Sequence, residues 1–374
     1  MNIALLGFGV VGSGVYEWCR GCEDLHVRRV LVRSEKPQIA DIATHDFEDI
    51  LHDDSIDIVA EVMGGLHPAY EYVTAALKAG KHVVTANKAL IAAYYQELTE
   101  LAKAQGKALL CTAAVGGGIP WLVNLARCKK LDTICRVGGI MNGTCNYILD
   151  AMTRLGQDYG EALAQAQSLG YAEADPATDV DGIDAWHKLI LSVNVAFSVS
   201  VDRDTVPVAG IRHLLAEDVE RFSRHGLVCR LMTEASLENG VLNAWVQPTL
   251  CPLTSPEASV TTNFNLITFV GSVSDRMSFY GQGAGRYPTA YNVLQDCLDI
   301  QAGRGFYGTY GPRIRADNGE CRSFYLRGVP DWPEDRVETR WDDAVITVPV
   351  PVREMHAWYA DRREGFLAAL PANF

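Results

Sequence analysis

An acidic segment that ends in a lysine carries the residues best suited to chemistry in this sequence. It reads GYAEADPATDVDGIDAWHK over residues 170–188. Asp184 and Lys188 are four residues apart, so on a helix they lie on one face. Such a pair suits a site that holds an ammonium group and moves a proton. An ordinary surface ion pair has the same spacing and remains the alternative.

A glycine-rich turn near the start of the chain could bind a dinucleotide. Gly7, Gly9 and Gly12 form the pattern G-x-G-x-x-G between an expected strand at 3–6 and an expected helix. The first glycine permits a tight turn, the second lets the backbone approach a pyrophosphate, and the third lets helix and strand pack closely. Free N–H groups at the start of the helix favour phosphate. The alternative is a turn that is merely rich in glycine.

The residues after the second expected strand bear on the choice between NAD and NADP. Val32 is followed by Arg33, Ser34, Glu35 and Lys36, where an acidic residue would bind the ribose 2′-hydroxyl of NAD. Arginine at this point can accommodate the 2′-phosphate of NADP, so Arg33 and Lys36 favour NADP. Glu35 keeps NAD open, and all three could also be solvated turn residues.

The elements that must position these residues change in character along the chain. Over residues 1–110 short apolar strands alternate with helices, which predicts a Rossmann-type, doubly wound parallel sheet in an α/β fold. After Pro120 the alternation is less strict and predicts an α/β domain with a mixed sheet. Asp179 or Asp181 is expected to cap the helix that begins at Ile183. The tail is expected to form strands at 324–327 and 344–350 and helices at 335–340 and 353–370.

These patterns predict two domains and a short appendage. Residues 1–125 form the expected dinucleotide-binding domain, to which 286–305 return. Residues 126–285 form the expected catalytic, substrate-binding and dimerisation domain. Residues 306–374 form the expected C-terminal appendage, which could be a reduced ACT-like module.

Composition excludes several classes of protein. The chain has 374 residues with a formal net charge of -13, and such a surface repels nucleic acid. It has no uncharged apolar run of about 18 residues, so no membrane span is predicted. The N-terminus lacks the features of a signal peptide, which predicts a cytoplasmic protein. The ten cysteines, with one C-x-x-C pair at Cys19 and Cys22, are expected to be free thiols.

Five ordered blocks make the sequence resemble the homoserine dehydrogenase family. They are residues 61–69, 80–88, 139–147, 170–188 and 281–290. The resemblance covers about residues 1–300 and implies NAD(P)-dependent interconversion of L-homoserine and L-aspartate 4-semialdehyde. It also implies a place in threonine and methionine biosynthesis and a homodimer or higher homo-oligomer.

The resemblance implies roles for the residues around the substrate. Glu173 and Asp184 match acids that hold the substrate amino group. Lys188 matches the catalytic lysine, and Lys88 matches a lysine between cofactor and substrate that is a second candidate proton carrier. The residues implied to lie beside the substrate are Tyr171, Asn142, Gly143 and Thr144.

The resemblance also extends the cofactor site beyond the glycine-rich turn and Arg33. NADP or NAD is the implied cofactor, because the cofactor must accept the hydride while the protein positions it. The further contacts implied are at Val10, Val11, Gly65, Thr85, Ala86, Lys88, Gly170 and Gly283.

The segment 111–120 departs from the family pattern at one position. The family has a glutamate where Thr112 stands, and that carboxylate holds a monovalent cation such as sodium or potassium. Three backbone carbonyls, matching those of Val115, Gly117 and Ile119, complete the family site. Hard cations depend on charged oxygen ligands, so without the carboxylate a cation is expected to bind weakly or not at all.

Two other functions remain open from the sequence. One is a related NAD(P)-dependent dehydrogenase of another small amino-acid alcohol or aldehyde. The other is a catalytically inactive regulator that binds the cofactor. The presence of Lys88, Glu173, Asp184 and Lys188 together argues against the regulator, because a binding protein needs neither both lysines nor both acids.

Overall fold

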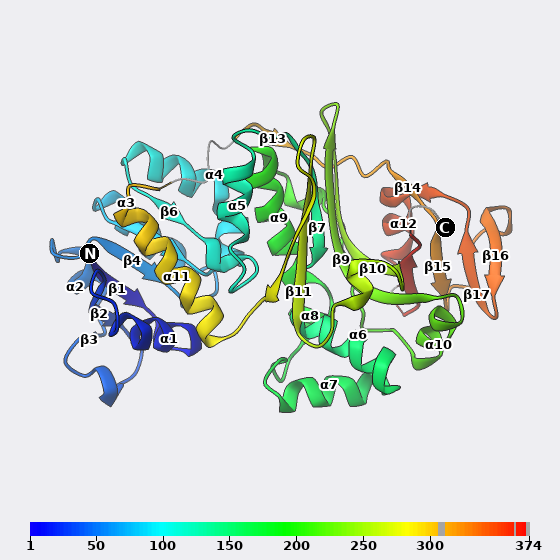
Figure 1. The fold of residues 1–374 in the computed structure, drawn as a ribbon, viewed down its shortest axis with the longest axis horizontal. Helices are drawn as coiled ribbons and strands as arrows, with labels where there is room; N and C mark the ends of the chain where they lie inside the picture. Colours follow the sequence, from blue (N-terminus) through cyan, green and yellow to red (C-terminus); the bar gives the residue numbers. More distant parts are fainter. Residues whose placement is uncertain (306–310, 363, 372–374) are drawn as a thin grey trace. The chain divides into compact units, whose positions relative to one another are not determined.

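The chain divides into two compact units in the computed structural model, which describes residues 1–305, 311–362 and 364–371 (Figure 1). The units are interleaved along the sequence. The first comprises Met1–Leu131, Asn194–Ser200 and Gly281–Pro312, and the second comprises Asp132–Val193, Val201–Tyr280 and Arg313–Phe374. The domain boundary expected at residue 306 falls in the segment 306–310, outside the described residues.

The first unit contains a six-stranded sheet in which every strand is parallel to its neighbours. The strands are β1 (Asn2–Leu6), β2 (His26–Leu31), β3 (Ala43–Thr44), β4 (Ile58–Glu61), β5 (His82–Thr85) and β6 (Leu109–Leu110). Their order is β3-β2-β1-β4-β5-β6. This confirms the Rossmann-type sheet, and the order reverses between β1 and β4. Ligands of open parallel sheets bind at such a switch point, beyond the carboxyl ends of the strands.

Helices accompany this sheet, and two of them pack especially closely. The helices of the first unit are α1 (Val10–Cys19), α2 (Glu48–Leu51), α3 (Ala69–Lys78), α4 (Lys88–Ala104), α5 (Trp121–Cys128) and α11 (Arg286–Gln301). Figure 1 shows α11 beside α1 despite their distance in sequence. A Cβ atom on Gly14 would lie 3.0 Å from the backbone oxygen of Arg286, so a glycine is needed where the helices meet.

The second unit contains a nine-stranded mixed sheet, which confirms the expected architecture. Its order is β12-β11-β7-β9-β10-β19-β15-β17-β16. Strands β10 and β19 are parallel, whereas β7, β9 and β10 pair antiparallel. The strands are β7 (Ile134–Ile140), β9 (Leu227–Glu238), β10 (Val241–Pro252), β11 (Phe264–Gly271), β12 (Asp275–Gln282), β15 (Phe324–Arg327), β16 (Val337–Trp341), β17 (Ala344–Thr347) and β19 (Phe366–Ala369).

Helices of the second unit follow the loops that carry the acidic segment. They are α6 (Gly143–Leu155), α7 (Tyr159–Ser168), α8 (Ala177–Val180), α10 (Ala216–Arg224) and α12 (Val352–Tyr359), together with α9 (Ile183–Phe197), which continues into the first unit. Asn142 caps α6, because its side-chain oxygen accepts the Cys145 N–H at 2.7 Å. Asp158 caps α7 in a capping box with Glu161. These caps fix the ends of the helices next to the acidic segment.

The C-terminal residues continue the sheet of the second unit. Strand β19 pairs with both β10 and β15, and Phe324 and Leu367 pack in one core with Trp245 of β10. The prediction of a helix at 335–340 is wrong, because β16 occupies most of that range. The helix expected at 353–370 ends at Tyr359, and β19 follows. An apolar run buried between two strands lacks the alternation that distinguishes a strand from a helix.

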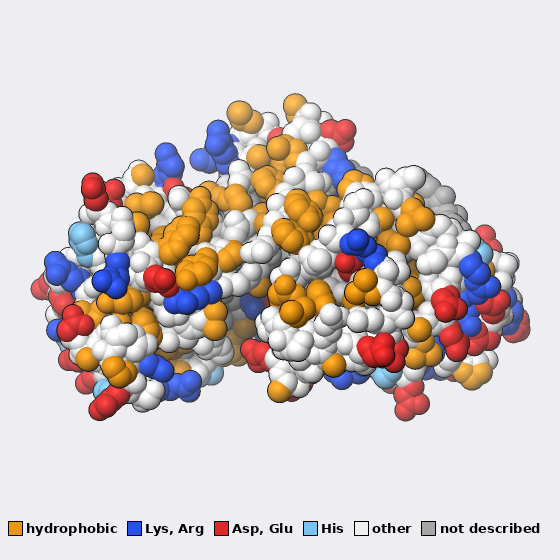
Figure 2. Space-filling view, turned by 60° about the horizontal axis from the view of Figure 1, so that its bottom comes forward, with side chains coloured by type: hydrophobic (Ala, Val, Ile, Leu, Met, Phe, Trp, Pro, Cys, Tyr) orange, Lys and Arg blue, Asp and Glu red, His pale blue; other side chains and the backbone are white. Residues whose placement is uncertain are grey.

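The surface carries charges of both signs. On the face drawn in Figure 2, Lys and Arg side chains are interspersed with Asp and Glu side chains. Interspersed charges do not add up to the single field that attracts a phosphate backbone. None of the helices in the described part of the chain has the length and apolar character needed to cross a membrane.

Candidate active site

The glycine-rich turn has the geometry that a pyrophosphate requires. Gly7 has a φ of +104°, and a Cβ atom on Gly12 would lie 2.3 Å from the Gly7 carbonyl oxygen. The strand and helix therefore approach too closely for any other residue at Gly12. A Cβ atom on Gly9 would meet nothing within 4 Å, so the backbone there faces open space. Because α1 begins directly after Gly9, its N-terminal N–H groups can serve a phosphate in that space.

A buried carboxylate joins the loops after β4 and β5, which sequence reasoning did not single out. Glu61 accepts hydrogen bonds from the Thr85 hydroxyl at 2.6 Å and from the Met63 N–H at 2.8 Å. Burial raises the pKa of Glu61. Asn87 donates its side-chain amide to the Gly65 carbonyl at 2.6 Å. Two loops predicted to contact the cofactor are thus held together. An acidic residue at the end of a buried strand, Glu61, is the feature of the sequence from which this contact could have been predicted.

The two basic residues predicted for the first unit lie at element ends. Lys88 is the first residue of α4 and is half-buried, and Asn87 caps that helix by accepting the Leu90 N–H at 3.1 Å. Arg33 lies two residues beyond β2 and is exposed. An exposed guanidinium after this strand is sterically available to a ribose phosphate.

The Lys188 ammonium lies in a buried polar cluster of the second unit. Its Nζ atom is 2.8 Å from Asp184 Oδ2 and donates to the Met141 carbonyl, also at 2.8 Å. The Asn142 amide donates to Asp184 at 2.8 Å and to Asp179 at 2.7 Å. Lys188 and Asp184 are 6% and 5% exposed, which excludes the surface ion pair left open by the sequence.

Asp179 belongs to this cluster rather than to the cap of α9. Its carboxylate accepts the Asn142 amide, and the carboxylate of Asp181 pairs with Arg212 at 2.8 Å. Neither of these two contacts is the cap of α9 that the sequence led us to expect from Asp179 or Asp181. Burial, and next the charge of Asp184, raise the pKa of Asp179. Two carboxylates therefore lie beside one lysine.

The remaining residues predicted for the substrate lie in α6 and in the loop that follows α7. Thr144 donates its hydroxyl to the Tyr171 carbonyl at 2.6 Å, and the Tyr171 ring lies 5.2 Å from the ring of Tyr147. Gly143 is the first residue of α6, and Gly170 follows α7 with a φ of +75°. Glu173 is exposed. Its carboxylate is therefore open to a solute, unlike that of Asp184.

The loop predicted to bind a cation makes hydrogen bonds to side chains of α11. Thr112 is buried and donates its hydroxyl to Asp296 at 2.6 Å. The carbonyls of Gly117 and Ile119 accept the side-chain amide of Asn292. Thr112 was predicted to weaken the cation site, but the part played by α11 was not predicted.

Comparison with known proteins identifies the family. Residues 7–112 match the model described as homoserine dehydrogenase, NAD binding domain, and residues 120–298 match the model described as homoserine dehydrogenase. A homoserine dehydrogenase of Corynebacterium glutamicum is 40% identical over 362 residues, covering 90% of this chain and 81% of that protein. The chain belongs to the homoserine dehydrogenase family. Members of this family are oxidoreductases, and the chain interconverts L-homoserine and L-aspartate 4-semialdehyde with NAD(P).

Further relatives of the homoserine dehydrogenase family extend the match to the whole fold. The Bacillus subtilis homoserine dehydrogenase is 38% identical over 314 residues, covering 80% of this chain and 72% of that protein. The structure of a homoserine dehydrogenase from Thiobacillus denitrificans superposes with a TM-score of 0.87 at 29% identity, covering 99% and 98% of the two chains. The family that the five sequence blocks resembled is therefore confirmed.

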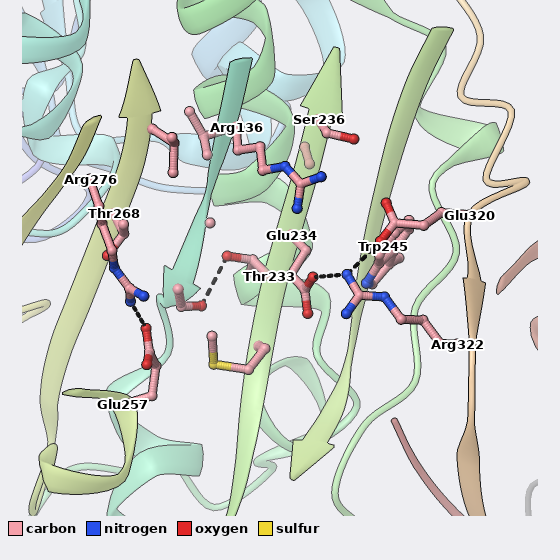
Figure 3. A pocket seen from close by; sticks show the side chains of 16 residues that line it. Arg136, Thr233, Glu234, Ser236, Trp245, Glu257, Thr268, Arg276, Glu320 and Arg322 are labelled. Carbon is pink, nitrogen blue, oxygen red and sulfur yellow. Dashed lines mark hydrogen bonds and ion pairs between the residues drawn. The ribbon is translucent and has the colours of Figure 1, made fainter. Parts of the chain in front are cut away.

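A separate pocket lies on the mixed sheet of the second unit. It has a volume of about 250 Å³, and none of the residues predicted for the active site lines it. Figure 3 shows Arg322 turned toward Glu234 and Glu320, and Arg276 turned toward Glu257. Arg322 pairs with Glu234 and Glu320, and Arg276 pairs with Glu257. Each of these five charged side chains has a partner of opposite charge within the pocket.

Proposed function

We propose that Lys188 carries the proton in the interconversion of L-homoserine and L-aspartate 4-semialdehyde. The observation that supports this role is its buried contact with Asp184 and the Met141 carbonyl. These two acceptors fix the direction of the side chain and leave one N–H of the ammonium for a reacting oxygen. NAD(P), when bound, supplies the acceptor or donor of the hydride. In the reducing direction the Lys188 ammonium donates its proton to the oxygen of the aldehyde, and in the oxidising direction the amine takes the hydroxyl proton.

The acids around Lys188 are proposed to bind the substrate ammonium group. Asp179 and Asp184 place two carboxylates in the cluster with Lys188, and carboxylates are the groups that bind an ammonium group with charge-assisted hydrogen bonds. Such hydrogen bonds are stronger where water is excluded, so these buried carboxylates suit an ammonium group. Glu173 is proposed as a third, exposed acid that contacts the same ammonium group.

The first unit is proposed to bind NADP in preference to NAD. Open space beside Gly9 accommodates the pyrophosphate, and the exposed Arg33 follows β2 where the 2′-phosphate is recognised in related folds. The hydrogen bonds of Glu61 and Asn87 hold the loops with Gly65, Thr85 and Ala86 in place for the rest of the cofactor. Lys88, at the start of α4, is proposed to contact the cofactor and to be the second candidate proton carrier.

Removing the substrate amino group tests the proposed recognition directly. Reduction of NADP can be followed by absorbance with L-homoserine and with 4-hydroxybutyrate, which lacks only that group. We expect kcat/KM to fall by at least about 100-fold for 4-hydroxybutyrate, because it cannot make the contact between the acids and an ammonium group. The Asp179→Asn variant should reduce this discrimination. Equal kcat/KM values for both compounds in the native enzyme would contradict the proposal.

The enzyme is also proposed to form a homo-oligomer through the mixed sheet. Within the described chain the buried Nε1 of Trp245 and Nε of Arg322, both at the pocket of Figure 3, lack hydrogen-bond partners. A second copy could cover this face of the mixed sheet. Sedimentation of the native enzyme and of Val270→Glu, which places a charge in the pocket lining, tests the proposal. A native monomer would contradict it.

A further inference from the structure

The loop that would hold a monovalent cation in this family is built differently in this chain. The 3-10 helix Thr112–Ala114 begins it, and the carbonyls of Val115, Gly117 and Ile119 are the ligands implied by the resemblance. A fourth ligand, the family carboxylate, is replaced by the neutral hydroxyl of Thr112. Every member of the expected set is therefore now an uncharged oxygen.

The Thr112 hydroxyl donates a hydrogen bond to a buried carboxylate of α11. It donates to Asp296 Oδ1 at 2.6 Å, and the Thr112 N–H donates to Asp296 Oδ2 at 2.8 Å. Both residues are 1% exposed. Hydrogen bonds to a buried carboxylate are strong, so this contact holds the start of the loop against the helix.

The side chain of Asn292 occupies the position between two of the carbonyls. Its Nδ2 atom is 2.5 Å from the Gly117 oxygen and 3.2 Å from the Ile119 oxygen, and the residue is 1% exposed. Asn292 and Asp296 are one turn apart on α11 and thus face the same loop. A cation that bridged the two oxygens would have to occupy the space of Nδ2. The residues present therefore do not fit a bound monovalent cation.

We propose that the Asn292 amide group takes the place of the monovalent cation in this chain. The amide presents two N–H donors, enough for both carbonyls, and carries no net charge that must be desolvated. The Asp296 contact to Thr112 replaces the link that the family carboxylate would make. The enzyme is accordingly independent of sodium and potassium, and Asn292 and Asp296 are positioning residues.

The loop held by the Asn292 amide packs closely against residues 282 and 283. A Cβ atom on Gly117 would lie 2.7 Å from the carbonyl oxygen of Gly283, and the Gly118 N–H donates to the Gln282 carbonyl at 3.2 Å. Gly283 is one of the residues that the family resemblance implies to contact the cofactor. Asn292 therefore holds a loop against which the proposed cofactor residue packs.

Thermal unfolding of the cofactor-free enzyme tests the proposal without relying on activity. The melting temperature and kcat are measured in sodium, potassium and tetramethylammonium chloride at matched ionic strength. A bound ion stabilises the folded state in a saturable way, by several degrees once its concentration far exceeds Kd. We expect both quantities to be the same in the three salts. A saturable rise with sodium or potassium in the native enzyme would overturn the proposal.

The Asn292→Ala variant should convert the loop into one that responds to cations. It removes both N–H donors and frees the space of Nδ2, so sodium or potassium should recover part of the lost melting temperature. Asn146→Ala is the matched control, because Asn146 is equally buried and its Nδ2 donates to the Val260 and Thr262 carbonyls at 3.3 and 2.9 Å. The control should lose stability without recovery in any salt.

Two results with these variants would contradict the proposal. Asn292→Ala with a native melting temperature in tetramethylammonium would show that the amide holds nothing. Equal recovery of both variants by sodium would show a general salt effect. If Asn292→Ala does not fold, sodium-23 relaxation of the native enzyme decides: line broadening that potassium reverses would reveal a bound cation and overturn the proposal.

Discussion

The Nζ atom of Lys188 lies 2.8 Å from Asp184 Oδ2, one helical turn away on α9, and both side chains are buried. Two partners of opposite charge in this arrangement fix each other's position. Because Asn142 also donates to Asp184, the loop after β7 determines where the pair points. The spacing of the two residues in the sequence predicted that they could pair. Their burial shows that the pair is not an ordinary surface ion pair.

The first prediction concerns the pH dependence of substrate binding. The raised pKa of Asp179 means that this carboxylate is protonated, and loses its charge, at a higher pH than an ordinary aspartate. The KM for homoserine should therefore rise as the pH is lowered from neutrality, before the ordinary aspartate range near a pKa of about 3.9 is reached. Asp179→Asn should have a raised KM that no longer changes over this interval. A native KM that stays flat down to the ordinary range would contradict the role of Asp179.

The second prediction concerns Glu173. Glu173→Gln should raise the KM for homoserine roughly 10-fold with little change in kcat, because it removes a charged contact made in both the ground state and the transition state. Steady-state kinetics at saturating cofactor measures both quantities. Glu161→Gln, at the exposed start of α7, is a control acid that should leave KM unchanged. An unchanged KM in Glu173→Gln would place the ammonium contact elsewhere.

The third prediction concerns cofactor choice. Arg33→Ala should weaken NADP binding about 10-fold and NAD binding far less, since only NADP carries the 2′-phosphate that a guanidinium can bind. The ratio of kcat/KM for the two cofactors measures the effect. Arg28→Ala removes a basic side chain from β2 and should not alter that ratio. Equal losses for both cofactors, or a native preference for NAD, would count against Arg33.

The fourth prediction separates two glycines of the same turn. Gly12→Ala should destabilise the enzyme by about 1–3 kcal/mol, because the new Cβ atom would overlap the Gly7 carbonyl. Gly9→Ala should fold normally, since Gly9 has a φ of -85° and its Cβ atom would meet nothing. It should nevertheless raise the KM for NADP, because the Cβ atom enters the phosphate space. A native KM in folded Gly9→Ala would show that the pyrophosphate binds elsewhere.

Local patterns explain what the sequence predicted correctly. The glycine turn could be recognised because its three requirements fall within six residues of one another. The pairing of Asp184 with Lys188 follows from helical spacing alone. The parallel sheet followed from continuous apolar strands such as β1 and β4, which are buried on both faces.

Contacts between distant segments explain what the sequence did not predict. The contact of Asn142 with Asp179 joins the loop after β7 to α8 across 37 residues. The contact of Asn292 with the Gly117 carbonyl spans 175 residues. Neither leaves a local pattern, because the fold alone brings the partners together. Strand β16 was mistaken for a helix, since its structure depends on pairing with β17.

The kcat of Lys188→Ala tests the central claim most directly. Removing a positioned proton carrier should lower kcat by roughly 100-fold or more, while the affinity for NADP, measured by fluorescence titration, stays near that of the native enzyme. Lys81→Ala is the matched control, because Lys81 is also buried but donates to the Asp53 and Ile56 carbonyls of the first unit. Its kcat per folded molecule should remain near native. A near-native kcat in folded Lys188→Ala would contradict the account and make Lys88 the proton carrier to test.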